Sequence, residues 1–263
     1  MCVLLYDGTW KGMLTLVFEK FEYKWQVVAV YQKDKITQGD IFHVSTEVIT
    51  SDTKALRVWK GLQLKLPSSA LSNLYKVFLS ELPRFEVTLC SVISFYFSGV
   101  DKPYLAYGRS DVLKVKQIAK MVDRERHRMK AFIRFRRQKD DLYFAVVEPD
   151  FNVLPLIRKH FSDRYADQRW LIYDLKRSYG IYYDLREVQE VHLEFSEGFQ
   201  EDKFVLEHAE EELYNVLWQQ YFHHVNIKER KNLKLHIQHV PKRYWKHLVE
   251  KQNPPRGMIN VDF

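Results

Sequence analysis

The sequence has little cysteine and little glycine, with two cysteines and nine glycines among its 263 residues. Cys2 and Cys90 are too few to hold an iron–sulfur cluster through four thiolates or to build a zinc knuckle. So few glycines argue against a glycine-rich nucleotide-binding loop. No Gly-x-Gly-x-x-Gly, Walker, Gly-x-Ser-x-Gly or His-Glu-x-x-His motif occurs either. The sequence therefore lacks the common signatures of nucleotide binding, serine hydrolysis and zinc-dependent proteolysis.

Long apolar runs are also missing. The longest weakly polar run, residues 87–100, has 14 residues, whereas a helix that spans a bilayer needs about 20. The first residues do not combine a basic segment with a long apolar one, as a signal peptide does. We therefore expect no signal peptide, no contact with a membrane and a cytoplasmic location.

The chain is rich in aromatic and basic residues. Apolar residues make up 46% of the chain, aromatic residues 15% and charged residues 29%, which is the composition of a folded globular protein. The 41 lysines and arginines outnumber the 34 acids and give a net charge of +7. A basic excess favours an anionic partner such as nucleic acid.

The charges are segregated along the chain. Residues 109–177 hold 18 basic and 10 acidic side chains, a net charge of +8, and residues 225–263 hold 9 and 3, a net charge of +6. Residues 184–212 between them hold 2 basic and 11 acidic side chains, a net charge of −9. If the two basic segments fold together, they form one basic face.

The spacing of apolar residues predicts an α+β fold. Residues 1–130 are mostly helical in their spacing, and residues 85–97 are apolar nearly all round, as in a buried helix. Residues 205–263 form a helical, basic tail. No internal repeat or linker is visible, so we expect one compact domain over residues 1–263.

Residues 131–195 are predicted to form the sheet at the centre of this domain. Alternating apolar and polar residues predict a hairpin between residues 132–136 and 142–147. A short helix over residues 151–161 and strands over residues 170–174, 179–184 and 188–195 follow. We expect a central antiparallel sheet, covered by helices from the N-terminal and C-terminal parts.

The densest basic feature enters this predicted hairpin. Arg134 and Arg136 are expected on the same face of a strand, next to the helix end that carries Arg128 and Lys130. Arginine binds phosphate through two parallel hydrogen bonds, so two arginines on one face suit successive phosphates. The alternative is a solvated helix end whose charges pair with acids such as Glu125.

A second group of polar residues follows the short helix and the next strand. His160 and Arg164 come at the end of the helix, and Arg177 follows the strand that ends at Asp174. Polar side chains at such ends are well placed to bind a phosphate. The alternative is a capped helix end and an ordinary hairpin turn.

One pattern in this region suggests metal chemistry. Asp150 follows a proline, and Asp174 and Lys176 close an apolar strand, which is similar to the Pro-Asp…Asp/Glu-x-Lys signature of magnesium-dependent nucleases. There, two carboxylates hold the metal ion and the lysine positions the attacking water. The alternative role of Asp150 is to cap the helix that follows it.

The tail offers a last basic and aromatic segment. Arg243 and Tyr244 suit nucleic acid, because phosphates take the charge and bases stack on rings. The alternative is a docked helix whose aromatic residues pack inward, with Trp245 in the core. The paired histidines 223–224 and 236–239 lack a third ligand nearby, so no metal site is predicted.

Eight stretches together carry a resemblance to a known family. They are Tyr6–Thr9, Phe78–Pro83, His127–Phe135, Glu148–Asp150, Val153–Phe161, Asp167–Asp174, Tyr179–Asp184 and Pro241–Trp245. Over nearly its whole length the chain resembles a bacterial family of uncharacterised proteins assigned to DNA metabolism or DNA repair. The resemblance implies a radical S-adenosylmethionine (radical-SAM) protein as the neighbour of its gene, and a similar domain is found fused to uracil-DNA-glycosylase-like domains. It supplies no catalytic residues.

We therefore expect a DNA-binding accessory or processing protein in DNA repair, acting with a radical-SAM partner and without a cofactor of its own. The expected contacts to nucleic acid are Arg128, Lys130, Arg134, Arg136, His160, Arg164, Arg177, Arg243 and Tyr244. One alternative is a DNA-modifying enzyme or nuclease that uses Asp150, Asp174 and Lys176 with Mg²⁺. The other is a protein-interaction module without affinity for nucleic acid.

Overall fold

The computed structural model describes residues 2–35, 45–139, 141–192, 237–248 and 251. The chain divides into two compact units, Met1–Arg124 and Glu125–Phe263, and helix α5 (Ser110–Phe132) contributes to both. Helices and sheets occur in both units, which confirms the predicted α+β class. That the two units fold together as one domain over residues 1–263 stays a prediction.

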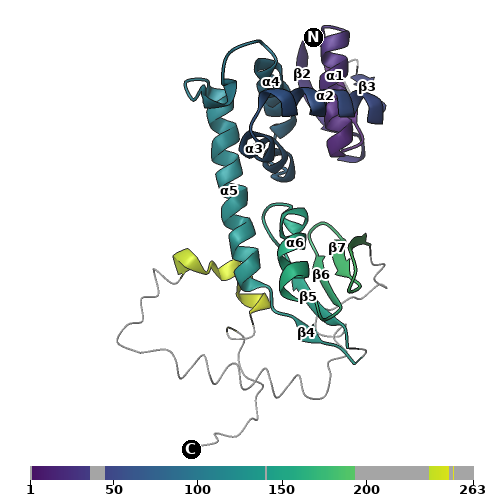
Figure 1. Cartoon of the computed structure of the whole chain (residues 1–263), viewed down its shortest axis with the longest axis vertical. Coiled ribbons are helices and arrows are strands. Elements are labelled where there is room, and N and C mark those ends of the chain that lie inside the picture. Colours follow the sequence, from purple (N-terminus) through teal and green to yellow (C-terminus); the bar gives the residue numbers. More distant parts are fainter. Residues whose placement is uncertain (1, 36–44, 140, 193–236, 249–250, 252–263) are drawn as a thin grey trace, which may run out of the picture. The chain divides into compact units, whose positions relative to one another are not determined.

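The first unit contains a three-stranded parallel sheet in the order β2-β1-β3, together with helices (Figure 1). Its elements are β1 (Cys2–Tyr6), α1 (Trp10–Glu22), β2 (Val27–Gln32), β3 (Ser45–Glu47), α2 (Asp52–Lys65), α3 (Ser68–Leu79) and α4 (Phe85–Tyr96). β1 and β2 are parallel because α1 carries the chain back to the same edge of the sheet between them. The core includes Leu4, Leu16 and Leu89, all fully buried.

Local sequence signals start the helices of this unit. The hydroxyl of Thr9 caps α1 by accepting the N–H of Gly12 at 2.9 Å, and the side chain of Ser51 caps α2 by accepting the N–H of Lys54. A Cβ at Gly12 would lie 2.1 Å from Oδ1 of Asp7, so a larger residue there would displace the Asp7 side chain. The prediction of a buried helix is confirmed, since most of α4 is buried.

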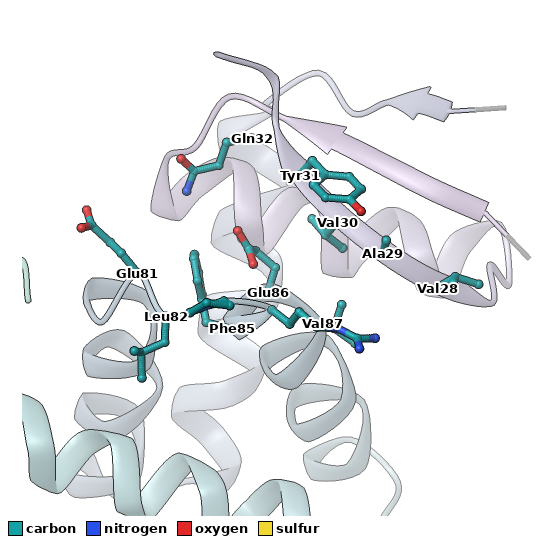
Figure 2. A pocket seen from close by; sticks show the side chains of 12 residues that line it. Val28, Ala29, Val30, Tyr31, Gln32, Glu81, Leu82, Phe85, Glu86 and Val87 are labelled. Atoms are coloured by element: carbon teal, nitrogen blue, oxygen red, sulfur yellow. The ribbon is translucent and has the colours of Figure 1, made fainter. Parts of the chain in front are cut away.

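Two cavities of ligand size open on the described part of the first unit. One, of about 590 Å³, lies between the edge strand β2 and residues 81–87 (Figure 2). The buried side chain of Glu86 points toward β2 there, and Glu81 and Arg84 have left-handed backbone, with φ of 51° and 63°. The other, of about 660 Å³, is lined by aromatic side chains of α1, α2 and α3.

The second unit is built on a five-stranded sheet in the order β4-β5-β6-β7-β8. Its elements are β4 (Arg136–Arg137), β5 (Tyr143–Val147), α6 (Leu154–Arg164), β6 (Trp170–Asp174), β7 (Tyr179–Tyr183), β8 (Val188–Val191) and a 3-10 helix (Lys242–His247). β5 and β6 are parallel, and the other neighbouring strands are antiparallel. The predicted antiparallel sheet is therefore wrong in its centre, because α6 carries the chain back before β6 begins.

The predicted hairpin is also wrong in its first strand. α5 continues to Phe132, because residues 110–132 contain no glycine or proline to end the helix. The strand β4 has only two residues, which pair with Tyr143 and Phe144. Arg134 therefore lies outside any strand and does not share a strand face with Arg136.

Apolar residues are buried on both faces of this sheet. Phe144, Leu171 and Tyr173 form a buried cluster on one face. On the other, Trp170 is fully buried and its ring lies 6.1 Å from the ring of Phe161, which α6 contributes. Figure 1 shows α6 beside β6 and β7. The sheet and α6 thus form a rigid base for the loops at the ends of β5 and β6.

Part of the predicted tail is described. The 3-10 helix buries Tyr244, while Trp245, which was predicted in the core, is half-buried. The predicted helix over residues 205–223 and the histidines at 223, 224 and 236 lie outside the described residues. Within the described ranges, no helix has the length and apolar character needed to cross a membrane.

Candidate functional site

Charged side chains and one tyrosine side chain, from four segments of the second unit, meet at residues 148–150, the loop that follows β5. The structure brings together six of them, which we call the charge network: Glu125, Asp150, Asp174, Arg177, Arg243 and Tyr244. Five of the six were predicted site residues, Glu125 being the exception. The two residues farthest apart in the sequence, Glu125 and Tyr244, are separated by 119 positions.

Glu125 is the buried acceptor of this network. It lies on α5 and is 1% exposed. Its Oε1 accepts the backbone N–H of Asp150 at 2.9 Å and the hydroxyl of Tyr244 at 2.5 Å. The guanidinium groups of Arg243 and Arg128 lie 3.5 Å and 3.6 Å from its Oε2. Burial, assisted by the hydrogen bond to Glu125, raises the pKa of Tyr244 above its ordinary value.

Asp174 and Arg177 form a second buried pair at the end of β6. Oδ1 of Asp174 accepts the backbone N–H groups of Lys176 and Arg177, and Oδ2 accepts from the Arg177 guanidinium at 2.8 Å. The side chains of Arg177 and Asp174 are only 8% and 0% exposed. Burial raises the pKa of Asp174, and its bonds with Arg177 oppose that shift. Because Arg177 also donates to the carbonyls of Pro149 and Asp150, it is committed to holding this loop.

Two residues of the tail, Arg243 and Tyr244, complete the charge network beside Asp150. The guanidinium of Arg243 lies 2.6 Å from Oδ2 of Asp150 and donates to the hydroxyl of Tyr244 at 2.7 Å. Beside it, Lys246 pairs with Glu148 at 2.5 Å. The tail thus packs against the rest of the second unit through Tyr244 and through ion pairs. Arg243 therefore stabilises the fold and is not only a surface cation.

The three residues of the nuclease pattern lie close together, as the pattern predicted. Lys176 donates to the carbonyl of Asp150 at 3.3 Å. However, the oxygens of Asp174 accept from N–H groups, and the carboxylate of Asp150 pairs with Arg243. Asp150 does not cap α6 either, since Val153 precedes the first helical residue. Both carboxylates are therefore bound by cations of this chain, and metal-dependent cleavage stays an untested alternative.

A second group of predicted residues comes from the C-terminal parts of α5 and α6. Lys130 near the end of α5 and Arg164 at the end of α6 both lie close enough to His160 to act on its charge. Partial burial and these two cations hold the pKa of His160 below its ordinary value, while Asp163 acts in the opposite direction. We call Lys130, His160 and Arg164 the cationic patch.

An acid beside the cationic patch pairs with a lysine outside it. The nearby carboxylate of Asp163 pairs with Lys159 at 3.0 Å. Among the described residues, no ion pair joins Lys130 or Arg164 to a carboxylate, and Arg164 is exposed. In contrast, Arg134 donates to the carbonyl of Ala131 at 2.6 Å, and Arg136 is half-buried in β4.

From the sequence, Glu125 was predicted only as a partner of the basic helix end, and not as the buried acceptor at the centre of the charge network. Its signal was present, because Ile118, Val122, Glu125 and Met129 recur at helical spacing on the buried face of α5. A carboxylate on a buried face needs donors from elsewhere in the fold. Tyr244 and Asp150 supply them here.

These features define an α+β protein whose mixed-sheet unit contains buried ion pairs and a cationic patch whose Lys130 and Arg164 form no ion pair with a carboxylate of the described residues. The sequence model of DUF4130, a domain of unknown function, matches residues 83–250, and the chain therefore belongs to this family. The matched range includes the whole charge network and the whole cationic patch. No match was found among curated proteins.

Proposed function

We propose that this protein binds DNA as an accessory or processing factor in DNA repair or DNA metabolism. The observation that supports it is the cationic patch, in which Lys130, His160 and Arg164 gather from two helices. The oxygens of a phosphate carry the complementary charge and accept hydrogen bonds from all three side-chain types. The net charge of +7 acts in the same direction over longer distances.

The proposal also includes a radical-SAM protein as a partner, and this part of it rests on the family resemblance described above. Any radical chemistry belongs to that partner. Cys90 is buried, and burial raises the pKa of its thiol to about 12, so it is a poor ligand for a cluster. Retention of the radical-SAM protein by the tagged, full-length chain tests this part of the proposal.

Removing two cations of the patch is expected to weaken DNA binding uniformly across sequences. In the double variant Lys130→Ala/Arg164→Ala, the slope of log Kd against log salt for duplex DNA should fall by about 0.9 for each lost phosphate contact. Fluorescence anisotropy with a labelled duplex across a salt series measures both quantities.

The matched control is Lys65→Ala/Lys114→Ala, which removes two exposed lysines of the first unit and lowers the net charge equally. The control should keep the slope of the wild-type protein. Equal losses in both double variants would assign the effect to net charge and contradict the patch.

DNA affinity is expected to depend on pH through His160. Its pKa lies below the ordinary value because of burial, Lys130 and Arg164, so the ring is neutral at pH 8. A bound phosphate favours the imidazolium, and affinity should therefore rise as the pH falls through the pKa of His160. Anisotropy titrations between pH 5.5 and pH 8 measure this rise.

His160→Gln should bind DNA at pH 8 nearly as the wild-type protein does but lose the gain at low pH. A variant that keeps the full pH dependence would remove His160 from the interface.

A further inference from the structure

The second cavity of the first unit has the form of a site for a flat aromatic ligand. It is a groove of about 660 Å³, a volume within the range of about 300–1,000 Å³ that is usual for small-molecule sites. Trp10, Trp59 and Tyr75 line it, and all three are half-buried. Leu56, which is 51% exposed, completes the apolar wall.

The rings of the groove are arranged at steep angles. The ring of Trp10 makes an angle of 81° with that of Trp59, at 6.2 Å between centroids, and 70° with that of Tyr75, at 5.5 Å. A flat ligand that stacks on Trp59 or Tyr75 therefore meets the ring of Trp10 edge-on. Both stacked and edge-to-face contacts between aromatic rings are favourable.

A charged pair adds hydrogen-bonding groups to the lining. Nζ of Lys11 lies 2.8 Å from Oδ1 of Asp52, and the two side chains are 66% and 76% exposed. The pair offers a donor beside an acceptor, which complements the edge of a nucleobase, where acceptors and donors stand side by side. A purely apolar ligand would leave this pair without a role.

The place of the groove in the fold is that of a ligand site. Trp10 and Lys11 open α1 directly after β1, and Asp52 opens α2 after β3. β1 is the central strand of this parallel sheet, and the openings of α1 and α2 follow the carboxyl ends of β1 and its neighbour β3. In open sheets of parallel strands, ligands bind outside the carboxyl ends of the strands.

We infer that this groove binds a single unstacked nucleobase of single-stranded DNA. The inference rests on the proposed function, because it specifies which part of the DNA the first unit binds. Base stacking on aromatic side chains tolerates all four bases, so the groove adds affinity for single strands without reading their sequence. The other cavity is lined by two aromatic residues, Tyr31 and Phe85, rather than three, and it has the buried carboxylate of Glu86 in its wall.

The test uses the full-length chain and two probes that contain 2-aminopurine, whose fluorescence falls when the base stacks. The first is a single-stranded oligonucleotide with one 2-aminopurine, and the second is the free 2-aminopurine deoxyriboside, which has no phosphate. The matched variants are Leu56→Glu and Leu64→Glu. Both leucines are exposed on α2, but only Leu56 lines the groove.

For the wild-type protein we expect quenching of both probes. Leu56→Glu should reduce quenching and weaken oligonucleotide binding about tenfold, within the range measured for loss of one stacked base. Leu64→Glu, which adds the same charge to the same helix, should behave as the wild-type protein. Trp59→Ala should lose quenching and Trp59→Phe should keep most of it.

The two proposals fail in different ways. If the oligonucleotide binds with a salt-dependent affinity but neither probe is quenched, or Leu56→Glu and Leu64→Glu are equal, the groove inference is overturned and DNA binding stands. If the free deoxyriboside is quenched in a Leu56-dependent way but the oligonucleotide does not bind, the groove holds a base and the proposed function is wrong.

Discussion

Glu125→Ala is expected to lower the free energy of unfolding of this protein by about 3–5 kcal/mol, the range measured when one partner of a buried ionic contact is removed. The carboxylate is 1% exposed and accepts from the hydroxyl of Tyr244 and the N–H of Asp150. Its removal leaves the buried hydroxyl of Tyr244 and the backbone N–H of Asp150 without this acceptor, and a buried donor without an acceptor costs about 1–3 kcal/mol. Urea unfolding followed by circular dichroism measures the loss.

Two further variants test the cause of this loss. Tyr244→Phe removes only the hydroxyl, so it should cost about 1–2 kcal/mol. Asp163→Ala removes a carboxylate whose ion pair with Lys159 is exposed, and it should leave the unfolding curve nearly unchanged. If Glu125→Ala were no more destabilising than Asp163→Ala, the charge network would not stabilise the second unit.

Asp174→Ala is expected to have an effect of similar size, about 3–5 kcal/mol, for a related reason. The side chain of Arg177 is 8% exposed, and it would keep its charge there without the carboxylate that pairs with it. The backbone N–H groups of Lys176 and Arg177 would also lose their acceptor. Asp174→Asn keeps an oxygen at this position and should be less destabilising than Asp174→Ala. Urea unfolding of both variants gives the comparison.

The same pair of variants separates this account from the nuclease alternative. The account predicts that the folded wild-type protein does not cut DNA in the presence of Mg²⁺, because cations of this chain already bind both carboxylates. Strand cleavage by the wild-type protein, lost in Asp174→Asn at unchanged fold, would establish the nuclease instead. Gel electrophoresis of a labelled strand measures cleavage.

Much of the secondary structure could be predicted from the sequence, because its signals are local. The strand at Trp170–Asp174 and the buried helix at residues 85–96 appear where the apolar patterns placed them. The parallel pairing of β5 with β6 was also within reach, since a predicted helix between two strands favours a parallel pair. The end of α5 was missed because residues 132–136 alternate over a window too short to separate a strand from a helix end.

The candidate site was predictable in its residues but not in their roles. Asp150, Asp174 and Lys176 do lie together, as their spacing suggested. Contacts between distant segments decide which arginines pair with carboxylates of this chain and which are available to a ligand. Arg243 meets Asp150 across 93 positions of sequence, and Arg177 turns back onto Asp174. A run of basic residues therefore predicts a basic segment, whereas only the fold separates its structural cations from its exposed ones.

The most direct test of DNA binding is fluorescence anisotropy of the wild-type protein with single-stranded and duplex DNA across a salt series. The account predicts binding at low salt that weakens linearly in log Kd against log salt, with a slope that gives the number of phosphate contacts. No binding to either DNA at low salt would contradict the account. The protein would then be better explained as a module that binds only proteins.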